Sequence, residues 1–207
     1  MPPRADRPEE PGDGSDGIKA HPATARSLRV HDAVLHAARE LLAEGGLAAA
    51  TVDAISARSG VSKTTIYRHW PSRAAVAAEA FGRIMADALP LPDTGSAVGD
   101  LTAQVRLVSD FYATQPVFAE LLASCVTKPS TTPYFRKFFL AERRRKIAIL
   151  WQRAVDRGEV DSGIDVEVAQ DLLFGPLIFR LMTGHRPLIP EEAGKIAAAA
   201  LGGLLRH

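Results

Sequence analysis

The sequence predicts an all-α protein, and the spacing of its apolar residues carries most of that prediction. From residue 97 onward, apolar side chains recur three and four positions apart, and no window shows the strict alternation of a half-buried strand. Glycine and proline stand where helices would end or begin, as at Gly45-Gly46, Pro90 and Pro190. At 207 residues, the chain is long enough to bury a substantial core.

The composition of the first 25 residues predicts a disordered tail. They are rich in Pro, Gly, Asp and Glu and lack the apolar side chains that would offset the entropy cost of ordering. The GDGSDG segment superficially resembles a phosphate or calcium loop. No strand pattern precedes it, however, and the downstream glutamate of a calcium loop is absent. A flexible tail is therefore the preferred interpretation.

The sequence of residues 26–72 predicts three helices. The first spans about 27–44 and ends at Gly45-Gly46. The second begins after Thr51, a natural N-cap, and ends at Gly60, where positive φ is required. Ser62 can cap a third helix almost at once, and Trp70 lies on its buried side. Two helices joined so tightly must cross steeply, as in a helix-turn-helix.

The outer face of the third helix carries groups that suit DNA. Hydroxyls, a phenol, a guanidinium and an imidazole match phosphates and base edges, and the helix fits a major groove. Any solvated helix also carries such residues, but the tight turn favours the DNA interpretation. We expect Thr64, Thr65 and Arg68 near bases. The full predicted set of DNA-contacting residues is Thr51, Ser62, Lys63, Thr64, Thr65, Tyr67, Arg68, His69 and Arg73.

The charge distribution agrees with this placement. The formal net charge is only +1, but residues 1–17 hold two basic and five acidic residues, and residues 18–83 hold nine basic and five acidic. Residues 84–207 hold fourteen of each, so the positive excess belongs to the segment with the motif. An additional interpretation is that Lys19, Arg26 and Arg29 let the end of the tail touch the adjacent DNA backbone or minor groove.

Several short motifs of this region resemble those of a known protein family. The matching positions are Thr51, Ile55, the GVS turn at 60–62, TIYRHW at 65–70 and PSR at 71–73. Residues 51–81 thereby resemble the DNA-binding core of the TetR (tetracycline-repressor) family of bacterial regulators. The chain departs from the family pattern at Ser56 and Ser59, where alanine is commoner, and at Trp70, where phenylalanine is. It departs also at Arg73, which replaces lysine and keeps the charge.

Residues 73–207 predict a helical domain that begins with a connecting helix over 73–88. Further helices are expected over about 97–114, 116–127, 133–157, 166–183 and 191–205. The basic run at residues 143–146 is a candidate second nucleic-acid site. Because consecutive charges point in different directions around a helix, a solvated face is the preferred interpretation.

The resemblance implies that this domain holds a pocket for a small-molecule effector of unknown identity, mostly apolar or aromatic. Trp151 and Tyr112 would supply the few hydrogen-bonding groups of this pocket. Most large apolar residues on these helices would be core in any helical domain. Cys125, the single cysteine, is a redox-sensor candidate, but a buried small hydrophobe is the preferred interpretation. The candidate ligand-binding residues are Phe111, Tyr112, Phe118, Leu122, Cys125, Trp151, Phe174 and Ile178.

The last two predicted helices mix large apolar residues with small ones that permit close helix packing. They form either an ordinary helical hairpin or, as the resemblance implies, the two-fold interface of a homodimer built as a four-helix bundle. A single recognition helix would bind too little DNA for useful specificity, which favours the dimer. The candidate interface residues are Leu172, Gly175, Phe179, Met182, Ile196, Ala200 and Leu204.

Together these expectations describe a ligand-responsive, sequence-specific DNA-binding regulator, a repressor released from a palindromic double-stranded operator. The alternatives are a helical enzyme and a protein-binding module without an operator. HExxH, CxxC, GxSxG and GxxxxGK[ST] motifs are absent, and His31 and His36 are five positions apart, so we expect no enzyme, metal or cofactor. With no membrane-length apolar run, we expect a cytoplasmic, nucleoid-associated protein that does not bind membranes.

Overall fold

The computed structural model describes residues 25–204, and all regular elements within that range are helical, as predicted. The predicted tail and Lys19 lie outside the described residues, apart from Ala25 at the start of the first helix. Arg26 and Arg29 are described and exposed on that helix. No helix in the described range is long and apolar enough to cross a membrane.

The first three helices form the helix-turn-helix that the sequence predicts. Helix α1 spans Ala25–Ala49, and its backbone leaves the helical region at Gly45 and Gly46 before one last turn. Helix α2, Val52–Ser59, is capped by the Thr51 hydroxyl, which accepts from the Ala54 N–H, and ends at Gly60 with φ 69°. Helix α3, Lys63–His69, is capped by Ser62, which accepts from the Thr65 N–H.

Helix α4, Arg73–Ala88, starts at the Ser72 cap and has the predicted bounds. One side packs on α1, and another packs against the segment of residues 132–140. Its buried residues include Val76, Ala80 and Phe81. The helix therefore joins the first three helices to the rest of the chain through its own core contacts.

The remaining helices form a bundle: α5 (Ala97–Thr114), α6 (Pro116–Thr127), α8 (Ala141–Asp156), α9 (Val166–Thr183) and α10 (Pro190–Leu204). The helix predicted over 133–157 is present, and the chain is helical without a break over residues 132–156. A 3-10 turn (η1, Pro129–Thr131) precedes this helix, whose first part consists of one α-helical turn (α7, Thr132–Phe135) and one π-helical turn (η2, Arg136–Leu140). Apolar periodicity does not reveal a single wide turn, because such a turn shifts the pattern by only one position.

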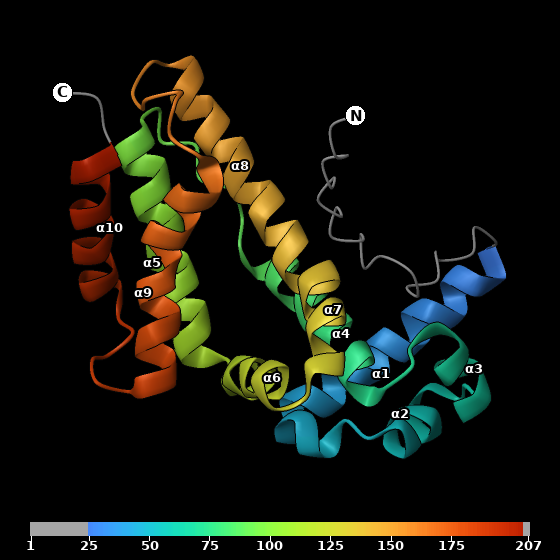
Figure 1. Ribbon diagram of the computed structural model, residues 1–207. Helices are drawn as coiled ribbons and strands as arrows, with labels where there is room; N and C mark the ends of the chain where they lie inside the picture. Colours follow the sequence, from blue (N-terminus) through green and yellow to red (C-terminus); the bar gives the residue numbers. More distant parts are fainter. Residues whose placement is uncertain (1–24, 205–207) are drawn as a thin grey trace, which may run out of the picture.

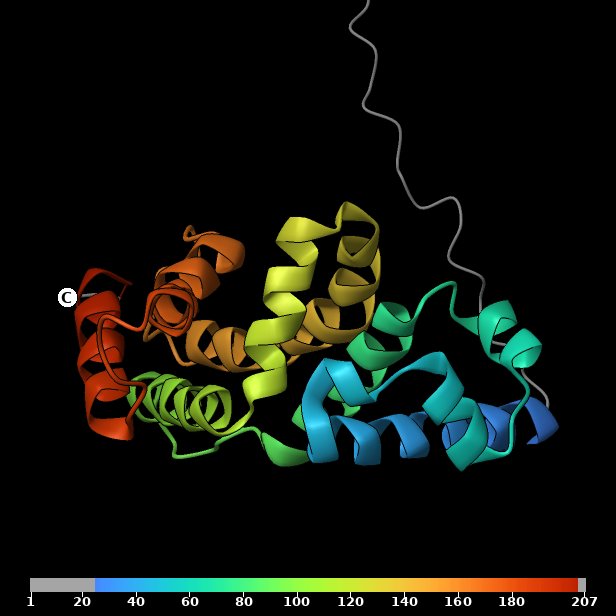
Figure 2. The same cartoon turned by 90° about the horizontal axis from the view of Figure 1, so that it is seen from below.

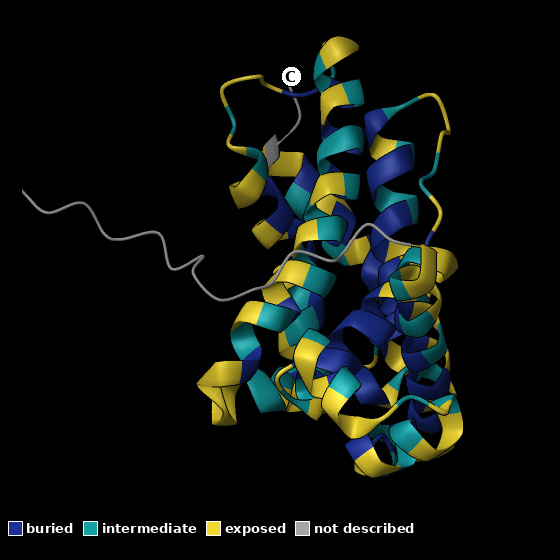
Figure 3. Ribbon diagram, turned by 90° about the vertical axis from the view of Figure 1, so that its right-hand side faces the viewer, coloured by how far each residue is buried: buried dark blue, intermediate teal, exposed yellow. Residues whose placement is uncertain are grey.

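The α2–α3 pair and the α9–α10 pair lie at opposite ends of an elongated molecule (Figures 1 and 2). Buried residues line the inward sides of the helices between them (Figure 3). They form one hydrophobic cluster that includes Trp70 after α3, Phe81 on α4 and Phe118 on α6. Because the core is continuous, a change in side-chain packing within the bundle can reach α3 through α4.

Candidate nucleic-acid interface and internal cavity

The outer side of α3 presents a row of polar groups to solvent. Lys63, Thr64, Tyr67 and Arg68 are exposed, and Tyr67 retains 52% of its accessible surface although it is a large aromatic residue. Ile66 is fully buried on the opposite side. The ring and hydroxyl of Tyr67 are therefore both available to a partner molecule.

Lys63 forms an ion pair with Asp53 of α2. A hydrogen bond to Asp53 and the charge of its carboxylate raise the pKa of the lysine, which is therefore protonated at neutral pH. Both side chains are exposed, and exposed pairs are weak, so a DNA phosphate can replace Asp53 as the partner.

The other predicted contact residues divide by local role. Thr51 and Ser62 use their hydroxyls as helix caps, and Thr65 is half-buried with its hydroxyl 3.0 Å from that of Ser62. His69 is half-buried, with its ring tilted against Trp70 at a centroid distance of 5.6 Å. Arg73 is exposed at the start of α4. The nine residues thus lie on α3, at the N-caps of α2 and α3, and at the start of α4, and their contact with DNA stays a prediction.

A buried polar cluster that the sequence reasoning missed holds α3 in place. Glu79 of α4 accepts a hydrogen bond from Trp70 Nε1 at 2.8 Å, and its other carboxylate oxygen lies 2.7 Å from His31 Nε2. The rings of His31 and Trp70 stack at 4.7 Å. Glu79 is buried, and a glutamate inside the apolar AVAAEAFG run was the available signal. The cluster ties the end of α3 to both α1 and α4.

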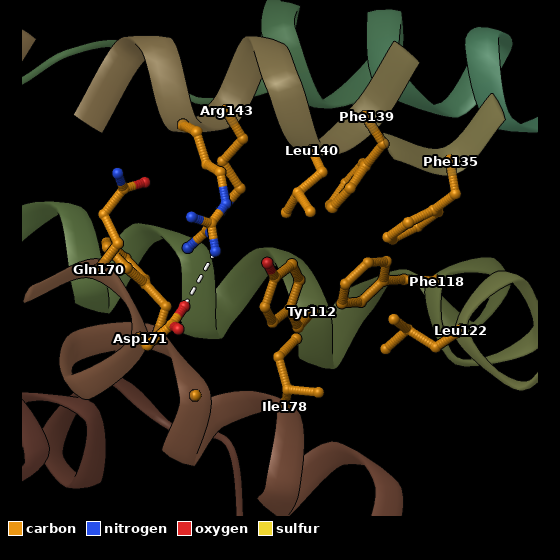
Figure 4. A pocket seen from close by; sticks show the side chains of 13 residues that line it. Tyr112, Phe118, Leu122, Phe135, Phe139, Leu140, Arg143, Gln170, Asp171 and Ile178 are labelled. Carbon is orange, nitrogen blue, oxygen red and sulfur yellow. Dashed lines mark hydrogen bonds and ion pairs between the residues drawn. The ribbon is translucent and has the colours of Figure 1, made fainter. Parts of the chain in front are cut away.

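The bundle contains a partly open cavity of about 240 Å³ between α5, α6, η2, α8 and α9 (Figure 4). Of the candidate ligand-binding residues, those that line it are Tyr112, Phe118, Leu122, Phe174 and Ile178. The sequence reasoning did not single out its other lining residues for this role: Phe135, Phe139, Leu140, Arg143, Arg144, Gln170, Asp171 and Gly175.

Phe111, Cys125 and Trp151 do not line this cavity. Phe111 neighbours Tyr112 but points to a different side of α5 and contacts Phe81, with ring centroids 5.6 Å apart. Trp151 is buried two helical turns beyond Arg143 on α8 and supplies no hydrogen-bonding group to this cavity. Cys125 is half-buried, and burial raises the pKa of its thiol, which disfavours the reactive thiolate.

The solvated-face interpretation of residues 143–146 is wrong for three of the four side chains. Arg143 is buried in the cavity wall, and Arg144 pairs with Glu167 and Asp171 of α9. Lys146 is half-buried and donates to the Ala86 carbonyl near the end of α4 at 2.9 Å. Only Arg145 is exposed. Helix α8 packs on α4, α5 and α9, so most of its circumference faces protein.

Aromatic rings form the wall of the cavity toward α6 and η2. Phe118 stacks on Tyr112 at 4.1 Å and lies 5.0 Å from Phe139, which in turn stacks on Phe135 at 4.6 Å. Burial raises the pKa of the Tyr112 phenol, which stays neutral at physiological pH. This wall suits an apolar or aromatic group.

Gly82 allows α4 to lie directly against the π-helical turn. A Cβ at this position would lie 2.1 Å from the Phe138 carbonyl oxygen, so no side chain fits. The next residues along that turn, Phe139 and Leu140, line the cavity. The cavity wall is therefore in backbone contact with the helix that leads to α3.

The outward side of α9 leaves large apolar residues exposed. Leu172, Phe179 and Met182 are about half exposed or more, with Phe179 at 62%, and Gly175 is exposed between them. Ile196 and Ala200 of α10 are half-buried. The Leu204 side chain lies outside the described residues. A contiguous apolar stripe of this kind is typical of a protein interface.

Within residues 25–204, no group of three or more His, Cys, Asp or Glu side chains is arranged to hold a metal ion.

Comparison with known proteins identifies both parts of the chain. A family model described as "Bacterial regulatory proteins, tetR family" matches residues 34–80, and one described as "Tetracyclin repressor-like, C-terminal domain" matches residues 91–200. The HTH-type transcriptional regulator YdeS of Bacillus subtilis (strain 168) is 36% identical over 159 residues, 76% of this chain and 80% of the relative. AqdR of Rhodococcus erythropolis, also an HTH-type transcriptional regulator, is 26% identical over 82% of each chain.

Solved structures agree. The TetR family transcription regulator SCO0332 has a TM-score of 0.78 and 32% identity, covering 85% of this chain and 98% of that one. FadR of Bacillus subtilis, solved in complex with stearoyl-CoA, has a TM-score of 0.58 and 17% identity, and the match covers 84% of this chain and 99% of that one. The relatives are transcriptional regulators rather than enzymes, so the enzyme alternative is set aside. The chain belongs to the TetR family of helix-turn-helix transcriptional regulators.

Proposed function

We propose that this regulator is a homodimeric repressor that binds a palindromic operator and is released by a small apolar or aromatic effector. The observation that carries the proposal is the polar outer side of α3, joined through α4 to a cavity inside the bundle. In this proposal, residues 26–72 read DNA, residues 73–207 bind the effector and dimerise, and the protein acts in the cytoplasm on nucleoid DNA.

The proposed DNA contacts follow from the chemistry and exposure of each side chain. Arg68 has the planar fork that pairs with the O6 and N7 acceptors of guanine, and Thr64 and Thr65 offer hydroxyls and methyl groups to base edges. Lys63, Tyr67 and Arg73 are exposed and suit phosphates, as does the partly exposed His69. The caps Thr51 and Ser62 place N–H groups of α2 and α3 near the same backbone.

The exposed stripe on α9 supports a dimer, because burying Leu172, Phe179 and Met182 against a second copy removes their apolar surface from water. Two-fold symmetry then presents two α3 helices to two half-sites. An effector in the cavity would act through η2 on Gly82 of α4 and so change the distance between the two α3 helices. The stearoyl-CoA complex of FadR, a neighbour in fold, supports a small-molecule effector in this architecture.

The proposal is tested by selecting duplexes from a random pool and titrating the consensus at several salt concentrations. Wild type should lose affinity steeply with salt, and Tyr67, Arg68 and His69 changed together to alanine should abolish specific binding. Lys63→Ala should weaken binding to all sequences and reduce the salt slope by about 1, whereas Arg68→Ala should relax preference at particular base pairs. Arg145→Ala, at an exposed arginine near the start of α8 and outside the predicted set of DNA contacts, is the matched control. Equal operator occupancy by wild type and the triple variant contradicts the proposal.

Gly82→Ala is expected to destabilise the protein by about 1–2 kcal/mol, because overpacking costs about 1–3 kcal/mol while alanine regains about 0.5–1 kcal/mol of helix propensity. The new methyl must push α4 away from the Phe138 carbonyl. Urea unfolding measures the loss. Gly202→Ala, at a helical glycine with open space around it, should be neutral or stabilising. If both variants unfold alike, the close contact at Gly82 is not a constraint.

A further inference from the structure

Arg143 lies on α8 with its guanidinium in the cavity, and only 8% of the residue is exposed (Figure 4). Its Cζ lies 4.0 Å from the centre of the Phe174 ring, which covers one flat side of the group. Nε and Nη2 are buried and form no hydrogen bond with any described residue. These two nitrogens lie on the same edge of the guanidinium, and their N–H bonds form the planar fork that binds a carboxylate bidentately.

No acidic side chain in the described part of the chain forms an ion pair with Arg143. Its neighbour Arg144 pairs with both acidic residues on the facing side of α9, Glu167 and Asp171. Tyr112, which interacts with the charge of Arg143, has a neutral phenol. Because arginine keeps its charge in proteins, the cavity holds a positive charge that the surrounding side chains leave uncompensated.

The other lining residues limit the chemistry and size of the part of a ligand that carries its negative group. Beyond Tyr112 the wall contains the rings of Phe118, Phe135 and Phe139, which offer stacking surface and no hydrogen-bond donors, and aliphatic side chains complete it: Leu122, Leu140 and Ile178. The volume of about 240 Å³ lies below the range of about 300–1,000 Å³ that is typical of drug-sized ligands. A compact aromatic group fits these dimensions and this chemistry better than a long acyl chain.

We infer that the effector of this regulator is a small aromatic carboxylate, whose carboxylate binds the Nε–Nη2 edge of Arg143 and whose ring packs against the phenylalanine wall. This inference rests on the proposed function and narrows its effector from any apolar or aromatic molecule to an anionic one. Gln170 lines the same end of the cavity, and its buried Oε1 makes no hydrogen bond with a described residue, so it can accept one from a ring substituent.

The first test is calorimetric titration of the full chain, without DNA, with benzoate, phenylacetate and 3-phenylpropanoate. The matched probes are the corresponding neutral amides and, as an aliphatic acid, hexanoate. At least one aromatic carboxylate should bind 10-fold or more tightly than its amide. Arg143→Met should remove this preference, Arg143→Lys should weaken it because lysine lacks the fork, and Arg145→Met should leave it unchanged.

Three results overturn the inference: equal binding of acid and amide, unchanged carboxylate binding by Arg143→Met, and failure of wild type to bind any aromatic carboxylate. Tighter binding of hexanoate than of the aromatic acids overturns the inference that the effector carries an aromatic ring. A second readout is the melting temperature without ligand. Arg143→Met should melt higher than wild type, because it removes an uncompensated buried charge. A lower melting temperature would assign Arg143 a purely structural role through its Phe174 contact.

Operator binding, measured separately, distinguishes this inference from the proposed function. If an aromatic carboxylate binds through Arg143 but leaves the operator complex intact, the ligand site is supported and the effector role is contradicted. If wild type binds its operator and no carboxylate enters the cavity, the inference fails while the DNA-binding proposal stands.

Discussion

Glu79→Ala is expected to lower the free energy of unfolding by about 3–5 kcal/mol. The carboxylate accepts from Trp70 Nε1 and lies at hydrogen-bonding distance from His31 Nε2, and all three side chains are buried. Alanine removes both contacts and leaves a space between α1, α4 and the end of α3. Trp70 then loses the hydrogen bond that fixes its ring, so operator affinity should fall together with stability.

Urea unfolding at a fixed protein concentration measures this loss. Asp87→Ala is the matched control on the same helix, because Asp87 forms an exposed pair with Arg39 at 3.2 Å. Such a pair contributes at most about 1 kcal/mol. Glu79→Gln keeps the shape and one acceptor oxygen and should lie between the two. If Glu79→Ala loses no more stability than Asp87→Ala, the cluster does not hold α3 in place.

Most helix ends could be predicted because the chain marks them locally. Ser72 and Ser96 cap α4 and α5 through their own hydroxyls, and Pro116 begins α6 at a position where its missing N–H costs nothing. Gly60 has the positive φ that its place in the turn requires. Each of these signals depends on residues within one helical turn, so the sequence alone contains the information.

The side chains that the sequence reasoning missed depend on distant neighbours. Glu79 and Arg143 both lie in helices, where a charged residue is normally solvated. The apolar run around Glu79 indicates that it is buried but does not identify its partners, and the basic run around Arg143 gives no sign of burial. His31 approaches Glu79 only after α1 packs on α4, 48 positions away in sequence. Arg143 faces the cavity because α5 and α9 cover its side of α8. Tertiary packing therefore decides which charges of this chain are functional candidates.

Helix α9 shows a related difficulty. Its apolar residues surround most of the helix, so their spacing does not separate a side facing the core from a side facing a partner. The fold of the single chain makes that separation: Leu173 and Leu177 are buried, whereas Leu172 and Phe179 are exposed. The predicted interface residues on α9 are therefore accessible to a second copy, and dimerisation itself stays a proposal.

Phe179→Glu is expected to weaken the dimer by about 1,000-fold or more. Phe179 is the most exposed large residue of the α9 stripe, and two-fold symmetry places the change twice in one interface. A central aromatic residue contributes about 2 kcal/mol or more, so two contribute about 4 kcal/mol, which corresponds to roughly 1,000-fold. A dimer that binds through two α3 helices gains about 100- to 10,000-fold in affinity over a monomer that binds through one. Operator affinity should therefore fall by at least about 100-fold. Sedimentation and operator titration measure the two effects.

Val126→Glu is the matched control, because Val126 is another exposed apolar residue and lies on α6, away from the stripe. It should remain dimeric and bind the operator like wild type. A folded Phe179→Glu monomer that still binds an aromatic carboxylate would show that effector binding does not require the dimer, whereas operator binding does. A Phe179→Glu protein that remains dimeric at nanomolar concentration would place the interface elsewhere, and the pairing of two α3 helices would then need a different symmetry axis.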